Sequence, residues 1–306
     1  MVKEKIQLAP IVLFVYKRID TLKATILSLQ KNYLASESDL IIFSDSWKTE
    51  KDKVEVEVVR KYIASINGFR SVTIKLNKIN TGLANSIING VSEVLSVHGK
   101  VIVLEDDLVS STNYLNFMNQ ALENFKEEKQ VFSISGYSFN LKIPNDYVKD
   151  SYFLNRGWSW GWATWRDRWL NVDWSVSNYD NFKKNSFLRN QFSKGGSDLN
   201  AMLDKQMTGK LDSWAIRWFF YQFCIKGFTV FPVQSKIYNI GFGQDATHTK
   251  GSNKRYIPSF DTSEKVDFEF ERFEEMNGYF QKKFQEKMSL LERIKSRLDT
   301  ILMKLR

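Results

Sequence analysis

The sequence has 306 residues, of which 44 are lysine or arginine and 35 are acidic, so its net charge is +9. A hydrophobic fraction of 43% and an aromatic fraction of 14% exclude a disordered chain, because so much apolar surface would not stay solvated. The single cysteine excludes a disulfide framework, and no apolar run approaches the ~20 residues of a membrane span. We therefore expect a cytoplasmic protein of one large domain or two closely packed ones, with a polyanionic partner that charge alone does not identify.

The first half of the chain alternates strand-like and helix-like patterns. Four short apolar segments are typical of strands: residues 10–16, 39–45, 71–76 and 101–104. Helical spacing of apolar residues occupies the stretches between them. This alternation predicts an α/β fold with a doubly wound, mostly parallel sheet and flanking helices. Ligands bind such sheets at the carboxyl ends of the strands, and polar residues follow these predicted strands directly.

Three adjacent carboxylates, Glu105, Asp106 and Asp107, follow the fourth predicted strand. Adjacent carboxylates repel one another unless a cation or solvent screens them. A hard divalent ion, held by one or two of them and by the oxygens of a diphosphate, would resolve this repulsion and stabilise a departing nucleotide diphosphate. The alternative is an acidic cap for a helix that begins near Ser111. The position after a buried parallel strand favours the metal site.

Other strand ends carry residues suited to a nucleotide. Asp45 could accept hydrogen bonds from a nucleobase edge, or it could form a turn. Arg18 could pair with a diphosphate, or it could be a solvent-exposed residue beside a helix. Asn80 and Gly82 place backbone N–H groups at a helix N-terminus, which suits an anion. Together these features predict one nucleotide site.

The segment from Arg156 to Trp162 alternates bulky and small residues, with Trp160 and Gly161 near its end. In a strand its three tryptophans would share one face. Such a face could stack on a sugar ring, and the alternative is that the tryptophans belong to the core.

Two candidates for acid–base or loop chemistry lie later in the chain. Asp212 precedes an aromatic helix and could act as a general base beside Trp214, or it could be the N-cap of that helix. His248 lies in a glycine-hinged loop that could close over a nucleotide, or it could belong to an ordinary surface loop.

The last stretch, from about Gln281, is predicted as one basic amphipathic helix. Its apolar residues form a single stripe: Met288, Leu291, Ile294, Leu298, Ile301 and Leu305. Basic residues beside this stripe fit anionic lipids, so we expect peripheral attachment to the inner face of the cytoplasmic membrane. The alternative is packing on the domain or on a second copy, as in a homodimer.

The sequence resembles the nucleotide-sugar-dependent glycosyltransferases of the GT-A fold, and among them the bacterial sugar transferases related to the N-acetylglucosaminyltransferase I family. Seven segments carry the resemblance: Pro10–Arg18, Phe43–Asp45, Asn80–Leu83, Val101–Leu108, Gly157–Trp165, Asp212–Trp214 and Asn239–Gly241. The resemblance implies that Asp106 and Asp107 form a DXD-like motif, with Asp107 as the direct ligand of manganese or magnesium. It also implies that Asp212 is the base, although Ser213 stands where the family motif has a second acid.

We therefore predict a metal-dependent, inverting glycosyltransferase that moves a sugar from a nucleotide diphosphate sugar, expected to be a UDP-sugar, to a hydroxyl of a glycan or lipid-linked acceptor. Its site would comprise these residues: Arg18, Asp45, Asn80, Gly82, Glu105, Asp106, Asp107, Trp160, Gly161, Asp212 and His248. The predicted domain spans residues 8–250, divided into a nucleotide half at 8–110 and a catalytic half at 111–250, with an extension at 251–306. Surface polysaccharide synthesis is the expected role, and no nucleic-acid partner is expected. The alternatives are a nucleotidyltransferase and a non-catalytic basic protein that binds lipid or nucleic acid.

Overall fold

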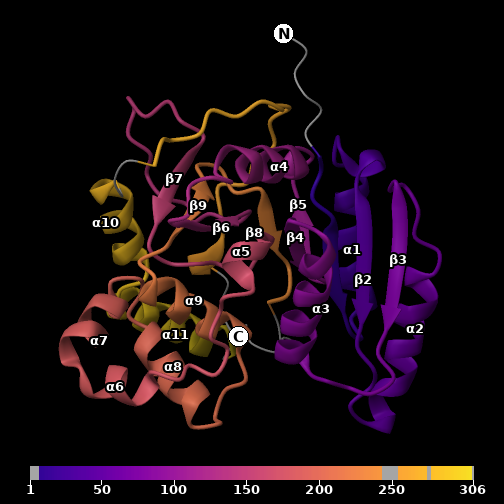
Figure 1. Cartoon of the computed structure of the whole chain (residues 1–306), viewed down its shortest axis with the longest axis horizontal. Helices are drawn as coiled ribbons and strands as arrows, with labels where there is room; N and C mark the ends of the chain where they lie inside the picture. The colour runs from indigo at the N-terminus through magenta and orange to yellow at the C-terminus, as the bar shows by residue number, and fades with distance from the viewer. Residues whose placement is uncertain (1–6, 243–253, 274–276, 305–306) are drawn as a thin grey trace.

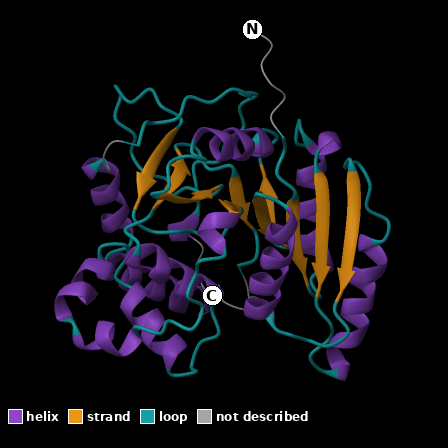
Figure 2. Cartoon of the chain, in the orientation of Figure 1, coloured by secondary structure: helices purple, strands orange, loops and turns teal. Residues whose placement is uncertain are grey.

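The computed structural model describes residues 7–242, 254–273 and 277–304 of the chain. Its centre is an eight-stranded sheet (Figures 1 and 2). In spatial order the strands are β3 (Ser71–Leu76), β2 (Asp39–Ser44), β1 (Ile11–Val15), β4 (Lys100–Glu105), β8 (Trp162–Trp165), β6 (Val131–Ser135), β9 (Phe228–Pro232) and β7 (Ser151–Leu154). A separate antiparallel pair joins β5 (Leu108–Ser110) to β10 (Ile237–Asn239).

Four of the seven neighbouring strand pairs in the large sheet are parallel, and they include the run from β3 to β4. The strands β8 and β7 run antiparallel to their neighbours. The predicted α/β class with a mostly parallel sheet is therefore confirmed, and the antiparallel strands belong to the second half of the chain, where the sequence pattern is less regular.

Eleven α-helices surround the sheet within the described residues. They are α1 (Ile19–Gln30), α2 (Lys53–Ile63), α3 (Leu83–Val97), α4 (Tyr114–Asn124), α5 (Arg166–Trp169), α6 (Tyr179–Lys184), α7 (Ser186–Ser193), α8 (Leu199–Met207), α9 (Trp214–Cys224), α10 (Gly278–Lys287) and α11 (Leu290–Lys304). In the parts of the chain that are described, none of them is long and apolar enough to cross a membrane.

The helices cover both faces of the sheet, as a doubly wound fold requires. Apolar residues of α1, α2, α4 and α10 pack in one buried cluster, and those of α3 and α9 pack in another. Strand β1 contributes side chains to both clusters, because Ile11 and Leu13 face the first cluster while Val12 and Phe14 face the second. The chain moves outward from β1 to β3 and returns to β4 through α3, so the direction of winding reverses between β1 and β4.

The predicted shared face of the three tryptophans is wrong. Trp158 and Trp160 contact each other on one side of the sheet, with ring centroids 5.4 Å apart. Trp162 lies on the other side, 4.5 Å from Trp218. The change of side occurs at Gly161, whose φ of +61° is open to glycine at little cost and which precedes the start of β8.

The predicted single C-terminal helix is two helices. In α10 the side chains of Phe280 and Phe284 are fully buried, and Met288, which follows that helix, is buried as well. Only α11 has the predicted exposed stripe. The assignment of Met288 to that stripe is therefore wrong, because the chain breaks between α10 and α11 and Met288 packs into the core.

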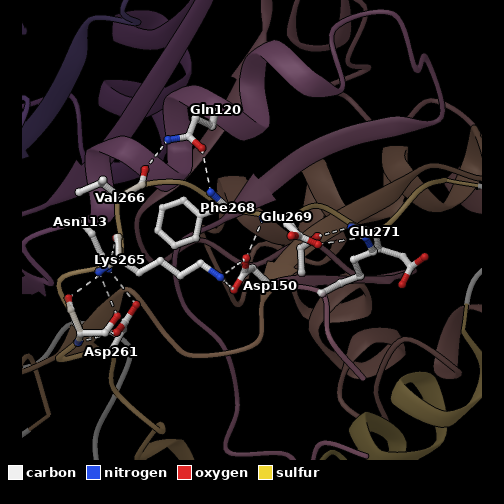
Figure 3. Close-up of polar contacts among 12 residues, drawn as sticks. Asn113, Gln120, Asp150, Asp261, Lys265, Val266, Phe268, Glu269 and Glu271 are labelled. Carbon is white, nitrogen blue, oxygen red and sulfur yellow. Dashed lines mark hydrogen bonds and ion pairs between the residues drawn. The ribbon is translucent and has the colours of Figure 1, made fainter. Parts of the chain in front are cut away.

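Along the chain between β10 and α10, residues 261–271 run beside α4 and β7, and we call this segment the strap (Figure 3). Gln120 holds it through the backbone of Val266 and Phe268, and Asp150 accepts from Lys265 Nζ at 2.7 Å. At its start, Asp261 forms a buried ion pair with Lys236 and accepts from Asn113 Nδ2 at 3.0 Å. The strap thereby fixes Lys236, which immediately precedes β10.

Candidate functional site

The candidate site lies where the direction of winding reverses. Strands β1 and β4 are parallel neighbours, with Phe14 opposite Glu105, so the residues that follow them leave the sheet side by side. Arg18 there forms ion pairs with both Asp106 and Asp107, and its Nη2 lies 2.9 Å from Asp107 Oδ2. Open α/β sheets bind ligands at this kind of reversal point, outside the carboxyl ends of the strands. The fold therefore brings together three residues that the sequence separates by almost ninety positions.

Arg18 is the cation that the acidic triplet requires. The side chains of Asp106 and Asp107 are only 6% and 12% exposed, so two unscreened negative charges would be costly there. Burial raises the pKa of Asp106 to about 6, an effect that the guanidinium of Arg18 opposes. Burial also raises the pKa of Glu105 to about 8, with Asp107 and Asp106 adding to the shift. Burial and the neighbouring carboxylates thus favour the protonated form of Glu105, while the guanidinium of Arg18 favours the charged form of Asp106.

Asp45 and the N-terminus of α3 bind each other. The Asp45 carboxylate accepts from the backbone N–H groups of Thr81 and Gly82 at 3.1 and 3.0 Å, and from Asn77 Nδ2 at 3.0 Å. The sequence suggested that Asp45 binds a nucleobase and that the backbone amides near Asn80 and Gly82 bind a separate anion. In this structure the anion at those amides is the Asp45 side chain, which is buried.

Asn80 belongs to the same loop cluster. Its Nδ2 donates to the carbonyl of Ser46 at 2.7 Å, and Arg60 Nη2 donates to the carbonyl of Asn77 at 2.8 Å. These bonds join the loops that follow β2 and β3. Sequence reasoning did not include Asn77 and Arg60, although Asn77 directly follows a predicted strand, as the selected residues do.

Gly241 contacts the triplet from the other side. A Cβ atom added there would lie 1.9 Å from Asp107 Oδ2, so only glycine leaves room for this carboxylate. The backbone N–H of Ile240 donates to the carbonyl of Asp107 at 2.9 Å, which continues the β5–β10 pairing. In the sequence, the only signal for this position is its place in the Asn239–Gly241 segment.

Trp160 and Gly161 lie on this same side. Trp160 is half-buried, 5.7 Å from Phe242 between ring centroids, and Gly136 N donates to Gly161 O in the adjacent turn. His248 falls outside the described residues.

Asp212 is not the N-cap of α9, so that alternative is wrong. Ser213 occupies the cap, and its hydroxyl accepts from the backbone N–H of Ile216. The Asp212 carboxylate is 69% exposed and lies 3.7 Å from Arg217 Nη2. The helix begins at Trp214, whose ring centroid is 5.0 Å from that of Trp162. Because Trp162 pairs with Val103 of β4, the start of α9 lies beside the strand that carries the triplet.

The donor groups at Asp106 and Asp107 fit a hard divalent cation of the kind that takes few protein ligands. Across the described residues, no group of three or more His, Cys, Asp and Glu side chains could hold a metal ion. An all-protein cage is therefore not available there. Magnesium commonly uses one or two carboxylates and completes its shell with water and phosphate oxygens, which is the set that Asp106 and Asp107 could supply.

Comparisons with known proteins find structural likeness only. No family model matches the chain, and no curated protein matches it. Among solved structures, S. aureus TarS 1–349 is 11% identical, with a TM-score of 0.40 over 75% of this chain and 60% of that one. A second TarS structure is 12% identical, with a TM-score of 0.35 over 54% of this chain and 30% of that one.

A third similar structure is the mannosyltransferase PcManGT from Pyrobaculum calidifontis, in complex with GDP-Man and Mn2+. It is 13% identical, with a TM-score of 0.31 over 47% of this chain and 41% of that one. The chain thus spans less than two thirds of each of these proteins. Likeness this weak carries no argument about function, so the site is interpreted from its own residues.

The Arg18 pairing predicts a pH-dependent loss of stability. In Arg18→Met two mostly buried carboxylates lose their guanidinium, so the free energy of unfolding should fall by about 2–3 kcal/mol at about pH 8. A carboxyl whose folded pKa exceeds its unfolded pKa loses stability as pH rises, so the penalty should shrink at about pH 5. Urea denaturation at the two pH values measures this. Arg70→Met is the control, because its pair with Asp39 is largely exposed and should matter little. Equal effects of the two substitutions would contradict the assignment.

Proposed function

We propose that the protein is a GT-A-type glycosyltransferase, which transfers a sugar from a nucleotide diphosphate sugar to a hydroxyl of a glycan or lipid-linked acceptor. The observation that carries this proposal is the meeting of Arg18 with Asp106 and Asp107 at the reversal point of the sheet. A guanidinium can pair with a diphosphate, and paired carboxylates can hold a divalent ion on the same diphosphate. The resemblance in sequence order supports the same class, with a UDP-sugar as the expected donor.

In this proposal Asp107 is the metal ligand and Asp106 assists it. Manganese or magnesium bound there would supply Lewis-acid stabilisation of the leaving diphosphate. When the donor arrives, the Arg18 guanidinium exchanges carboxylate oxygens for phosphate oxygens, an exchange between similar charge-assisted hydrogen bonds. Asp45 holds the loop at Thr81 and Gly82 in place, where a nucleoside would lie against it.

Asp212 is the proposed general base of a single, inverting displacement. Its carboxylate would take the proton of the acceptor hydroxyl as the oxygen attacks the anomeric carbon. Support comes from its exposure, which leaves it free to meet an acceptor, and from the position of α9 beside β8 and β4. Its ion pair with Arg217 is long, at 3.7 Å, and leaves the carboxylate as a proton acceptor.

The metal assignment is tested by Asp107→Asn. We expect the substitution to abolish the manganese-dependent part of the affinity for UDP, because an amide is a far weaker ligand for a hard cation. Titration calorimetry of the full chain with UDP and GDP, with and without manganese, measures it. The exposed Asp146→Asn serves as the matched control. Metal-dependent affinity that survives in Asp107→Asn would remove the triplet from the metal site. Hydrolysis of a nucleoside triphosphate instead of a nucleotide sugar would favour a nucleotidyltransferase.

The base assignment is tested by Asp212→Asn. The transfer rate at saturating donor should fall by about 10²–10⁴, since an amide cannot take the proton. Nucleotide affinity and melting temperature should stay as in the parent. Ser213→Ala is the control for the helix end: it removes the observed N-cap, so it should lower stability by about 1 kcal/mol without a comparable loss of rate. Near-normal transfer by Asp212→Asn would show that another group is the base.

The C-terminal helix supports a second part of the proposal, attachment to an anionic membrane surface. Helix α11 directs its aliphatic side chains away from the protein, with Leu291 71% and Leu298 54% exposed. Its polar side faces the body, where Arg293 Nη1 donates to the carbonyl of Ser197 at 3.0 Å. At 100° per residue, the exposed Lys295 and Arg297 border the two edges of the aliphatic face. An aliphatic face with basic borders is the pattern of a helix that lies in a lipid interface.

Vesicle flotation tests this attachment. The full chain should float with vesicles of phosphatidylcholine and phosphatidylglycerol, and Ile294→Gln with Leu298→Gln should abolish flotation while the fold is kept, since both side chains already face outward. Val148→Gln is the control, because this apolar residue is also exposed but belongs to the loop before β7 and not to α11. If the double variant instead abolishes a dimer seen by sedimentation, and the parent does not float, the face joins two copies and the membrane role is wrong.

A further inference from the structure

Three half-buried aromatic side chains meet beside the triplet, and we call them the aromatic platform: Trp160, Phe242 and Tyr256. The ring centroids of Trp160 and Phe242 are 5.7 Å apart, those of Trp160 and Tyr256 are 5.5 Å apart, and those of Phe242 and Tyr256 are 5.7 Å apart. Each ring therefore contacts the other two, although they come from three separate segments of the chain. Each ring also keeps part of its surface exposed, whereas a ring that served only the core would be buried.

A buried layer supports the platform from below. Tyr137 lies 4.7 Å from Trp160 and stacks on Trp158, between ring centroids, and both are almost fully buried. The hydroxyl of Tyr137 donates to the carbonyl of Tyr256 at 3.0 Å. Arg255 stacks on the ring of Tyr256, with the guanidinium carbon 4.6 Å from its centroid, and donates to its hydroxyl. The rings are thus fixed before any ligand arrives, which lowers the entropy that binding would cost.

The platform adjoins the carboxylates. Phe242 is the residue after Gly241, the glycine whose missing Cβ leaves room for Asp107. Trp160 comes from the segment that enters β8, the neighbour of β4 on the side away from β1. Tyr256 lies five residues before Asp261, the first residue of the strap (Figure 3). Asp261 in turn is bound by Lys236 and Asn113. The platform and the Asp45 cluster therefore lie on opposite sides of the triplet along the sheet.

We propose that the aromatic platform binds a pyranose ring of the acceptor glycan, placing it beside Asp107. This inference rests on the proposed function, because it identifies which residues of that site receive the second substrate. A pyranose has one face lined by C–H groups, which packs on aromatic rings, and a rim of hydroxyls. The indole N–H of Trp160 and the hydroxyl of Tyr256 are polar groups on otherwise apolar rings, suited to orient that rim. In the proposed function the nucleotide lies against the loop that Asp45 holds, which leaves this side for a sugar.

Saturation-transfer NMR on the full chain with a panel of methyl hexopyranosides and methyl N-acetylhexosaminides tests the proposal. At least one glycoside should receive saturation through its C–H face, and the acyclic glucitol should not. Phe242→Ala and Tyr256→Ala should each weaken that binding by about threefold to tenfold, the loss expected for one aromatic contact. The affinity for UDP with manganese should stay unchanged. Phe187→Ala is the matched control, since Phe187 is 66% exposed on α7.

Conservative variants separate binding from folding. Phe242→Leu keeps apolar volume but loses the flat ring, so it should weaken glycoside binding at an unchanged melting temperature. Tyr256→Phe keeps the ring and should retain most of the binding. If no glycoside binds, or if Phe242→Leu binds it as well as the parent, the platform proposal is overturned. If Phe242→Ala instead weakens UDP binding, the rings stack on the nucleobase, and the proposal is equally overturned.

The two proposals fail independently. Glycoside binding that depends on the platform, in a protein that neither binds a nucleotide diphosphate nor transfers a sugar to the bound glycoside, would leave the platform as a carbohydrate site and refute the transferase. Hydrolysis of a nucleotide sugar without any glycoside binding would support the transferase and refute the platform.

Discussion

The pairing of Arg18 with Asp106 and Asp107 is the interaction on which the arrangement of this site depends. Parallel strands β1 and β4 end side by side, so whatever follows them is forced into one small volume. Two mostly buried carboxylates in that volume need a positive charge, and Arg18 supplies it in the described structure. The guanidinium thus screens the two carboxylates in the absence of a ligand. Guanidinium and carboxylate groups are also the groups that pair with phosphates and with cations.

The same principle operates at the second cluster of loops. Backbone amides at the start of α3 would bind an anion, and Asp45 provides that anion from within the chain. The glycine at Gly82 has a φ of +77°, which other residues rarely adopt, and this conformation turns its N–H toward the carboxylate. Ion pairs and hydrogen bonds to the start of α3 therefore hold the loops after β1, β2, β3 and β4 in position.

The side of the candidate site away from Asp45 is built from β10 with the residues around it and from the strap. Lys236 and Asp261 form a buried ion pair, which is costly to desolvate but would be strongly destabilising to break on one side only. It ties the strap to the residue before β10, and β10 in turn leads to Gly241 and Phe242. Residues late in the sequence thus lie at the same edge of the sheet as Asp106 and Asp107, so part of the predicted extension at 251–306 packs beside the candidate site.

The sequence by itself determined the alternation of strands and helices, because buried parallel strands need continuous apolar runs and the helices between them need a 3.6-residue period. It also placed Arg18, Asp45 and the triplet at strand ends, which a parallel sheet brings to one edge. Only the tertiary structure decided how these groups pair, since charge balance depends on which strands are neighbours. It also decided that Trp160 and Trp162 lie on opposite faces, because one glycine at positive φ reverses the pattern, and that Met288 is core while Leu291 is not, because the break between α10 and α11 depends on packing that no local period records.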